Sequence, residues 1–325
     1  MGCFRMHTMN GALVLDKPAG ITSHDAVSAV RRLTRQRSIG HLGTLDPFAT
    51  GVLVLLLGKA TRLAQFYKLT KKSYSGVMRV GFATDTFDFT GTSCGPDRAN
   101  DFQPEQLPGL MRQFVGTYLQ RPPIYSAKKV DGIPAHRRVR KGQAVVLAPV
   151  PVTIHKLTLD YIKEQHVGFS VTVSSGTYIR SIVNDIGERL GIGAHLAELR
   201  RTAVGNFPIE QAVTLDELES GLRDGREMIT PMNQLLPEIP SWKLPESDVQ
   251  GALHGQFIQA AAFAASEAPF LRLMAPDGNL LAMAEKAGGP LYHPLVVLGD
   301  VPTNETEVMG EADAGPATDP VAEGG

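Results

Sequence analysis

A single carboxylate, Asp46, lies in the middle of a glycine-rich stretch that reads GHLGTLDPFATG over residues 40–51. The glycines permit tight turns, and Pro47 disfavours a helical backbone at Asp46, so we expect Asp46 on a loop. An apolar run at residues 52–58 follows and is typical of a strand buried on both faces. A carboxylate held in this way beside the core is a candidate nucleophile or base. An aspartate that only shapes the turn before a proline is the alternative.

Arg180 is the second residue whose setting indicates chemistry. It falls near the start of a helix that is predicted from the spacing of Ile182, Ile186 and Leu190. The helix dipole disfavours a cation at this end, so we expect Arg180 to have a specific anionic partner. An arginine exposed on the helix surface is the alternative.

The remaining acids and the two cysteines give no sign of a metal or cofactor. Asp85 and Asp88 are three residues apart, but a metal site needs more ligands nearby, and we interpret both as acids that cap a turn. Cys3 and Cys94 have neither metal-ligand spacing nor a disulfide framework, which favours a reducing compartment. The sequence contains no P-loop, no GxGxxG motif and no zinc spacing. We therefore predict no cofactor and no metal.

Charge is distributed unevenly along the 325 residues. Residues 1–235 carry 29 Lys and Arg against 20 Asp and Glu, whereas residues 236–325 carry 3 against 13. The basic larger part indicates that a polyanion is handled there. Residues 124–148 are especially basic, and they are either a solvated surface or a phosphate-binding loop. Their cations are Lys128, Lys129, Arg137, Arg138, Arg140 and Lys141.

Strands and helices must position these side chains. The patterns predict strands at residues 12–15, 73–82, 144–146, 152–161 and 167–173, and a strand or helix-to-strand element at 195–204. Helices are expected at 61–67 and 107–115, after a cap at Ser23, and after a cap at Thr214. Beyond residue 236, a PDG turn at 276–278 predicts a hairpin, and residues 291–298 predict a further strand.

Five blocks of the sequence, taken in order, resemble the TruB family of tRNA pseudouridine synthases. The block around Asp46 matches that family's catalytic motif, GHxGTLDPxAxG. The others are GALVLDKPAGITSHDAV (residues 11–27), KSYSGVMRVGFATDTFDFTG (72–91), RPPIYSAKKVDG (121–132) and SSGTYIRSIVNDIG (174–187). The resemblance covers roughly the first 205 residues and implies that Asp46 is catalytic rather than structural.

The resemblance implies an RNA-modifying isomerase. Such an enzyme breaks the C1′–N1 glycosidic bond of a uridine and rejoins the ribose to C5, without a metal or redox cofactor. Its aspartate is a nucleophile at C1′ or a base at C2′. The nucleotide must be flipped out of a folded RNA arm, at a cost of a few kcal/mol. The implied substrate is the uridine at position 55 in the T loop of tRNA. A tRNA-binding folding chaperone and a base-excising glycosidase are the rival functions.

The resemblance also assigns roles to residues around Asp46. Arg180 is expected to pair with Asp46 and to lower its pKa below the ordinary value of about 3.9. Tyr74 is expected to pack against the target base, and Leu199 to line the base pocket. For Tyr74 and Leu199, an ordinary core position is the alternative.

Three further residues are implied in binding the substrate. His41 is expected to fill the space left by flipped bases, unless it only satisfies hydrogen bonds of its loop. Lys17 occupies the family's Lys-Pro position and is expected to support the active-site loop, unless it is an ordinary turn lysine. Tyr178 shares a block with Arg180 and is expected on the substrate side. Residues 124–148 correspond to a family insertion that grips RNA, although His136 replaces the usual tyrosine.

The resemblance implies an α+β fold, with a mixed, mainly antiparallel central sheet flanked by helices and a small C-terminal β-rich PUA-like domain. We expect an N-terminal extension at 1–8, a catalytic domain at 9–235, the PUA-like domain at 236–300 and a disordered acidic tail at 301–325. No apolar run approaches the roughly 18 residues that span a bilayer. The sequence thus predicts a cytoplasmic monomer that binds the T arm of tRNA, with no membrane and no protein partner implied.

Overall fold

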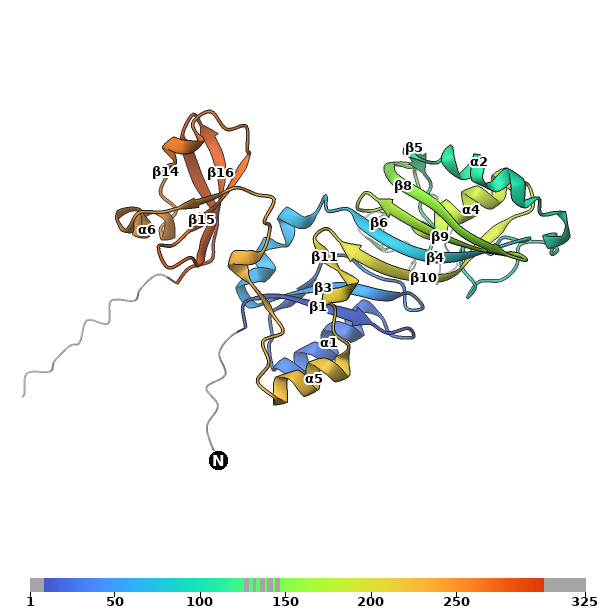
Figure 1. The fold of residues 1–325 in the computed structure, drawn as a ribbon, viewed down its shortest axis with the longest axis horizontal. Coiled ribbons are helices and arrows are strands. Elements are labelled where there is room, and N and C mark those ends of the chain that lie inside the picture. The colour runs from blue at the N-terminus through green and yellow to red at the C-terminus, as the bar shows by residue number, and fades with distance from the viewer. Residues whose placement is uncertain are drawn as a thin grey trace, which may run out of the picture.

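A ten-stranded mixed sheet forms the centre of the fold (Figure 1). The computed structural model describes residues 9–125, 129–130, 133–134, 138, 143 and 147–300. The strands of the sheet are β1 (Gly11–Lys17), β2 (Ile39–His41), β3 (Thr50–Leu57), β4 (Lys72–Val80), β5 (Gly116–Gln120), β8 (Val150–Lys163), β9 (His166–Val173), β10 (Ala194–Val204), β11 (Phe207–Pro208) and β12 (Thr230–Pro231).

The strand order is β12-β1-β3-β10-β4-β9-β8-β5, with β2 beside β3 and β11 beside β10. Among the named strands that the structure describes, the β3–β10 pair is parallel and the other pairs of this sheet are antiparallel. The predicted α+β fold with a mainly antiparallel sheet is therefore confirmed. The predicted strand at 144–146 lies outside the described residues.

Two pairs of helices cover the sheet. Helices α1 (Ser23–Thr34) and α5 (Leu215–Arg223) bury their apolar sides against β1 and β3. Helices α2 (Leu107–Arg112) and α4 (Ile179–Leu190) pack on the half built from β4, β8 and β9. In Figure 1 the two pairs lie at opposite ends of the large sheet.

The caps of α1 and α5 are built in the same way. Thr214 caps α5 as predicted, but the predicted cap of α1, Ser23, is wrong. The Thr22 hydroxyl accepts from the backbone N of Asp25 at 3.0 Å, and the Asp25 carboxylate accepts from the backbone N of Thr22 at 2.9 Å. This reciprocal capping box satisfies the helix end one residue earlier. Ser23 is therefore available for a contact elsewhere.

Strand β10 joins the two halves of the sheet. It runs antiparallel to β4, and its residues Arg200 and Arg201 pair in parallel with Thr50 and Gly51 of β3. Gly51 has a φ of 98°, and a Cβ at this position would lie 2.2 Å from the carbonyl oxygen of Arg201. Only glycine fits such an approach. The loop that carries Asp46 runs directly into β3, so this pairing places the loop beside β10.

A second domain follows the large sheet. Its five strands run in the order β13-β15-β16-β17-β14 and form a curled β half-barrel with its own apolar core. The predicted PDG hairpin joins β15 to β16, and the strand predicted at 291–298 is β17. The elements are β13 (Ser241–Lys243), α6 (Glu246–Leu253), β14 (Ile258–Gln259), β15 (Phe270–Met274), β16 (Leu280–Gly288) and β17 (Leu291–Val297).

The small domain packs on η1 (Gly58–Tyr67), the 3-10 helix that follows β3. The rings of Phe66 and Phe270 meet edge to face, with their centroids 5.2 Å apart. Arg272 donates from Nε to the carbonyl oxygen of Ile239 at 2.8 Å and from Nη1 to that of Asn233 at 3.1 Å. An apolar cluster shared by both domains therefore holds them together.

The remaining elements are short. They are η2 (Ala99–Asp101), η3 (Pro104–Gln106), the β6 (Lys129–Val130) and β7 (Ile133–Pro134) pair, η4 (Ile209–Gln211), η5 (Met232–Gln234) and η6 (Ala261–Phe263). None of the helices in the described part of the chain is long and apolar enough to cross a membrane.

Candidate active site

The side chains of Asp46 and Arg180 meet in the middle of the large domain. Arg180 Nη2 donates to Asp46 Oδ1 at 3.1 Å, and Arg180 Nε lies 2.9 Å from Asp46 Oδ2. Arg180 comes from the first turn of α4, where its side chain is only 5% exposed, whereas the Asp46 side chain is 35% exposed. The anionic partner expected for Arg180 is therefore Asp46. The exposed edge of the pair belongs to the carboxylate.

Asp88 is a second acid on the same guanidinium. Arg180 Nη1 lies 3.4 Å from Asp88 Oδ2, and the same nitrogen donates to the carbonyl oxygen of Thr86 at 2.9 Å. Asp88 also accepts from the backbone N of Thr90 at 3.0 Å, so it shapes its turn as predicted. The ion pair was not predicted, because nothing local in the sequence marks Asp88 as different from Asp85. Asp88 fixes Arg180 from the side away from Asp46.

Burial raises the pKa of the Asp46 carboxyl from its ordinary value. The Arg180 guanidinium opposes this shift, and the neighbouring Asp88 charge adds to it. The predicted lowering of the Asp46 pKa is therefore wrong in sign, because removal of water from the carboxylate outweighs the attraction of Arg180. In this structure Asp46 holds its proton more readily than an aspartate in water.

The backbone of the Asp46 loop is bonded at five consecutive carbonyl oxygens. Arg201 donates from Nη2 to the oxygen of Gly43 at 3.0 Å and from Nη1 to that of Thr44 at 3.4 Å. The Ser23 hydroxyl donates to the oxygen of Leu45 at 3.3 Å. The oxygen of Asp46 itself accepts from the backbone N of Ala49 at 3.1 Å, and that of Pro47 from Gly20 at 2.8 Å. A loop whose polar groups are paired in this way holds its carboxylate in one place.

Lys17 lies beneath the same loop with no exposed surface. Its Nζ donates to the carbonyl oxygens of Pro18, Ile21 and Pro47 at 2.8, 2.9 and 3.3 Å. Burial lowers the pKa of Lys17 to about 8, although the Asp46 charge opposes this shift. The contacts agree with the expected support of the loop. A side chain without exposed surface does not reach a substrate, so its expected place among the substrate-binding residues does not match this geometry.

Tyr74 and Leu199 belong to one apolar cluster with residues on both sides of the ion pair. They lie on neighbouring strands β4 and β10, and both are nearly buried. The same cluster contains Leu45, directly before Asp46, and Ile179, directly before Arg180. The structure thus brings four predicted residues, Asp46, Arg180, Tyr74 and Leu199, to one region.

His41 lies five residues before Asp46, and Tyr178 lies two residues before Arg180. His41 ends β2 and is partly buried, and burial, with Arg201 and His24 nearby, lowers its pKa, so it is neutral at pH 7. Tyr178 lies at the N-cap of α4, where its backbone N donates to Gln120 Oε1 at 2.9 Å. That contact fixes the start of the helix that carries Arg180.

Most of the predicted RNA-gripping segment cannot be placed. Lys128, Arg137, Arg140 and Lys141 lie outside the described residues, as does His136. Lys129 is described by its backbone alone, in β6, and Arg138 is partly buried. The role of this segment therefore stays a prediction.

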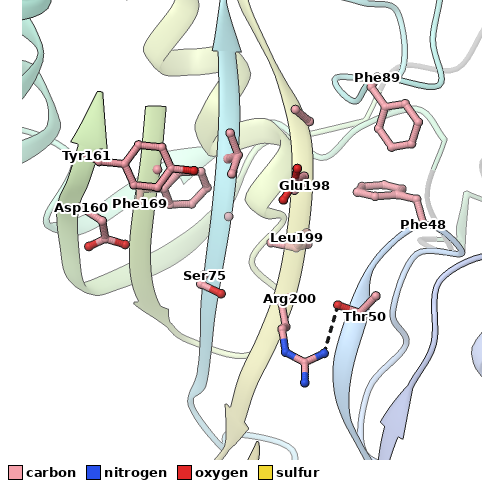
Figure 2. Close-up of a pocket in the computed structure, with 14 residues that line it drawn as sticks. Phe48, Thr50, Ser75, Phe89, Asp160, Tyr161, Phe169, Glu198, Leu199 and Arg200 are labelled. Carbon is pink, nitrogen blue, oxygen red and sulfur yellow. Dashed lines mark hydrogen bonds between the residues drawn. The ribbon is translucent and has the colours of Figure 1, made fainter. Parts of the chain in front are cut away.

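A pocket of about 510 Å³ lies beside the site, across β3, β10, β4, β9 and β8 (Figure 2). Leu199 lines it, whereas Asp46, Tyr74 and Arg180 do not. At one side, Phe48 and Phe89 meet edge to face with their centroids 5.4 Å apart. Because Phe48 is two residues from Asp46 and Phe89 follows Asp88, this aromatic pair lies close to the acids that contact Arg180. No group of three or more His, Cys, Asp or Glu within the described residues is arranged to hold a metal.

Comparisons with known proteins decide the family. A family model described as "TruB family pseudouridylate synthase (N terminal domain)" matches residues 31–179, and one described as "tRNA pseudouridylate synthase B C-terminal domain" matches residues 180–237. The chain belongs to the TruB family of pseudouridylate synthases. The predicted membership is confirmed, and with it the predicted class of enzyme, an isomerase.

Relatives over nearly the full chain agree. The chain is 42% identical over 293 residues to "tRNA pseudouridine synthase B" of Solibacter usitatus, covering 89% of this chain and 100% of that protein. It is 40% identical over 289 residues to the protein of the same name from Geotalea uraniireducens, covering 87% of this chain and 93% of that protein.

Solved structures show the same fold. An H/ACA RNP bound to a substrate RNA containing 2′-deoxyuridine includes a chain with a TM-score of 0.68 and 25% identity, covering 92% of this chain and 88% of that chain. A Cbf5-Nop10-Gar1 complex includes one with a TM-score of 0.68 and 27% identity, covering 90% and 86%.

The sequence analysis missed Arg201 and Ser23, which hold the Asp46 loop, and Lys72, whose side chain lies beside Gly43 of that loop. Alternation along β10 could have indicated Arg201, since it is two residues from Leu199 and so lies on the same face of the strand. Lys72 is likewise two residues from Tyr74 on β4. Polar residues at core-facing positions of two neighbouring strands are the signal.

Proposed function

We propose that this protein converts the uridine at position 55 in the T loop of tRNA into pseudouridine. The observation that carries the proposal is the Asp46–Arg180 pair, in which a buried guanidinium holds a partly exposed carboxylate in a chain of the TruB family. The tRNA substrate is supported by the name that the relatives share. We also propose that it acts as a monomer in the cytoplasm.

The proposed reaction begins with base flipping. The T loop is folded, so C1′ and C5 of the target uridine become accessible only after the nucleotide leaves the stack. We assign the face of Tyr74 to the extruded base, with Leu199 on the neighbouring strand and His41 in the space that the base vacates. A neutral His41 suits that last role because it adds no charge to an apolar stack.

The ionised Asp46 carboxylate then starts the chemistry, as a nucleophile at C1′ or as a base at C2′. As a nucleophile it forms a bond to C1′ that breaks when C5 bonds to C1′, and as a base it takes the C2′ proton and later returns it. The C1′–N1 bond breaks, the uracil turns, and a C5–C1′ bond forms. The proton on C5 is lost to solvent, and N1 gains one, so atoms and charge balance. Both routes need the carboxylate without its proton and at a fixed place, which is the arrangement that Arg180 and the bonded loop provide.

The small domain is assigned an accessory part in RNA binding. Residues 236–300 carry three cations against seven acids, and one of the cations, Arg272, is engaged with carbonyl oxygens of the linker between the domains. Such a surface contributes little attraction to phosphate. We therefore propose that residues 236–300 are a PUA-like domain that positions the RNA by shape.

A tRNA-binding chaperone without catalysis is disfavoured by Asp46. A carboxylate at an RNA-binding surface repels phosphate and weakens binding, so a protein that only binds tRNA gains nothing from a partly exposed aspartate. A catalyst requires it. A glycosidase would use the same carboxylate but would release free uracil and leave an abasic site.

Tritium release tests the proposal. The protein is incubated with tRNA transcript that carries tritium at uridine C5, and with a transcript that has cytidine at position 55. We expect tritium release from the first transcript at one equivalent per tRNA, none from the second, and none with Asp46→Asn. Release that is equal for Asp46→Asn would remove Asp46 from the chemistry, and free uracil among the products would establish the glycosidase.

A further inference from the structure

Lys72 is a nearly buried lysine that lacks an acidic partner within the described part of the chain. Its side chain projects from the first residue of β4, and the residue is 8% exposed. Its Nζ donates to the carbonyl oxygen of Thr70 and to the Ser175 hydroxyl, both at 3.2 Å. No carboxylate of the described residues forms an ion pair with it. A buried ammonium bonded only to neutral oxygens is costly.

A second cation makes this arrangement more unfavourable. A Cβ placed on Gly43 would lie 3.1 Å from Lys72 Cε and 3.7 Å from Arg201 Nη1, so both side chains converge on Gly43. Arg201 has no exposed surface, and its hydrogen bonds run to carbonyl oxygens of Gly43, Thr44 and Val52. Burial and the Arg201 charge lower the pKa of Lys72 to about 8. The protein thus keeps two like charges together.

The other two arginines near the site, Arg180 and Arg200, have acidic partners. Arg180 is matched by Asp46 and Asp88, and Arg200 by Asp16 through contacts of 2.7 and 3.0 Å. The Lys72–Arg201 corner therefore stands out as a place where positive charge is left for an anion from outside. We infer that Lys72 binds a phosphodiester of the substrate RNA, with Arg201 behind it strengthening the positive potential.

Exposed residues surround the Lys72–Arg201 corner on the side from which a phosphate would approach. Gly43 has no side chain to cover Lys72, and the next residue, Thr44, is exposed, as is Gly176 beside Ser175. Lys72 is two residues from Tyr74 on one face of β4, which places their Cα atoms about 7 Å apart at the usual rise per residue. That separation suits a phosphate next to the nucleotide whose base packs on Tyr74. The inference rests on the proposed function in taking RNA as the ligand and Tyr74 as the residue that packs on the target base.

The test measures RNA binding separately from catalysis. In an Asp46→Asn background, affinity for the T-arm RNA is measured between low and moderate salt for Lys72→Met and for Lys71→Met. Lys71 is the matched control, because it is the adjacent lysine, directly precedes β4 and is exposed. Lys72→Met is expected to weaken binding about tenfold and to reduce the log–log salt slope by about 0.7, the value for one single-strand phosphate. Lys71→Met is expected to leave both unchanged.

A phosphate scan distinguishes contact from a structural effect. The affinity of the Lys72 protein and of Lys72→Met is measured for T-arm RNAs that each carry one neutral methylphosphonate. We expect a methylphosphonate at one linkage beside the target nucleotide to weaken RNA binding by the Lys72 protein and to leave RNA binding by Lys72→Met unchanged. The inference is overturned if Lys72→Met keeps the parental affinity and slope, or if every linkage affects both proteins equally. If Lys72→Met does not fold, Lys72→Gln replaces it, and a scan of the Lys72 protein without any sensitive linkage also overturns the inference. If the protein with Asp46 intact releases no tritium while these binding results hold, the proposed function alone is rejected.

Discussion

The Ser23 hydroxyl accepts a hydrogen bond from the backbone N of Leu45 at 2.9 Å and lies 3.3 Å from the carbonyl oxygen of the same residue. One buried side chain in the first turn of α1 therefore satisfies both polar groups of the residue before Asp46. This contact ties the Asp46 loop to helix α1.

Ser23→Ala tests this tie. The substitution leaves the Leu45 amide without its partner, so it is expected to lower the free energy of unfolding by about 1–3 kcal/mol and to reduce kcat more than KM. Urea unfolding and single-turnover rates provide the measurements. Ser28→Ala on the same helix is the control and is expected to change the unfolding free energy by less than about 0.5 kcal/mol. Equal effects of the two variants would show that the tie contributes nothing.

Arg201→Lys tests whether the hydrogen bonds from Arg201 to Gly43 and Thr44 clamp the Asp46 loop in place. A lysine keeps the charge but has one nitrogen in place of the three with which Arg201 contacts the carbonyl oxygens of Gly43, Thr44 and Val52, so we expect a loss of about 2–4 kcal/mol in unfolding free energy and a fall in kcat of at least about tenfold. Arg200→Lys, which changes the neighbouring arginine on the other face of β10, should cost less than about 1 kcal/mol. A variant at Arg201 that retains full activity and stability would contradict the proposed clamp.

The acid side of the pH–rate profile should report Asp46. The reaction needs the ionised carboxylate, and burial raises its pKa, so the single-turnover rate is expected to fall with a midpoint above the ordinary value of about 3.9. Asp88→Asn removes a charge that raises this pKa and should therefore move the midpoint to lower pH. A midpoint that moves upward, or stays in place, would contradict the electrostatic part of the account.

The same shift has a consequence for stability. Folding favours the protonated form of Asp46, so its contribution to the unfolding free energy grows as pH falls through the raised pKa and is smallest at neutral pH. Asp46→Asn is therefore expected to keep at least the parental Tm at pH 7 while losing tritium release.

Gly51→Ala tests the close approach of β3 to β10. A methyl group there would overlap the Arg201 backbone at a φ of 98°, so we expect a destabilisation of more than about 3 kcal/mol. Gly225 is the control, because its φ is 69° and nothing lies within 4 Å of its Cβ position. Alanine at Gly225 should cost only the left-handed backbone term, about 1–2 kcal/mol. Similar melting temperatures for the two variants would refute the steric argument.

Local chemistry was enough to predict several elements. Pro47 and the glycines around it placed Asp46 on a loop, the apolar run after it is β3, and the PDG turn joins β15 to β16. In each case the decisive interactions lie within a few residues of one another. The prediction of Ser23 as the cap of α1 was wrong although the deciding signal is also local: Asp25, three residues after Thr22, completes a capping box, whereas Ala26 in the same position after Ser23 cannot.

The charges of the site could not be predicted from local pattern. Asp88 shares Arg180 with Asp46 across more than ninety positions of sequence, and Arg201 reaches Gly43 from a different strand. The sign of the Asp46 pKa shift depends on how much water the fold removes from the carboxylate, and no motif states this quantity. The family resemblance pointed to Asp46 and Arg180, whereas the residues that hold them, Asp88 and Arg201, could be found only from the structure.

Strand β10 also sets the distance between the strand that follows Asp46 and the strand that carries Tyr74. Asp46 precedes β3 and Tyr74 lies on β4, and β10 separates those two strands by a double interstrand spacing, close to 10 Å. The backbone hydrogen bonds between the strands keep this spacing constant even when the exposed loops change. The RNA-facing segments of such a protein can therefore change in sequence, and with them the RNA that is bound, while the spacing between the strands beside Asp46 and Tyr74 stays the same.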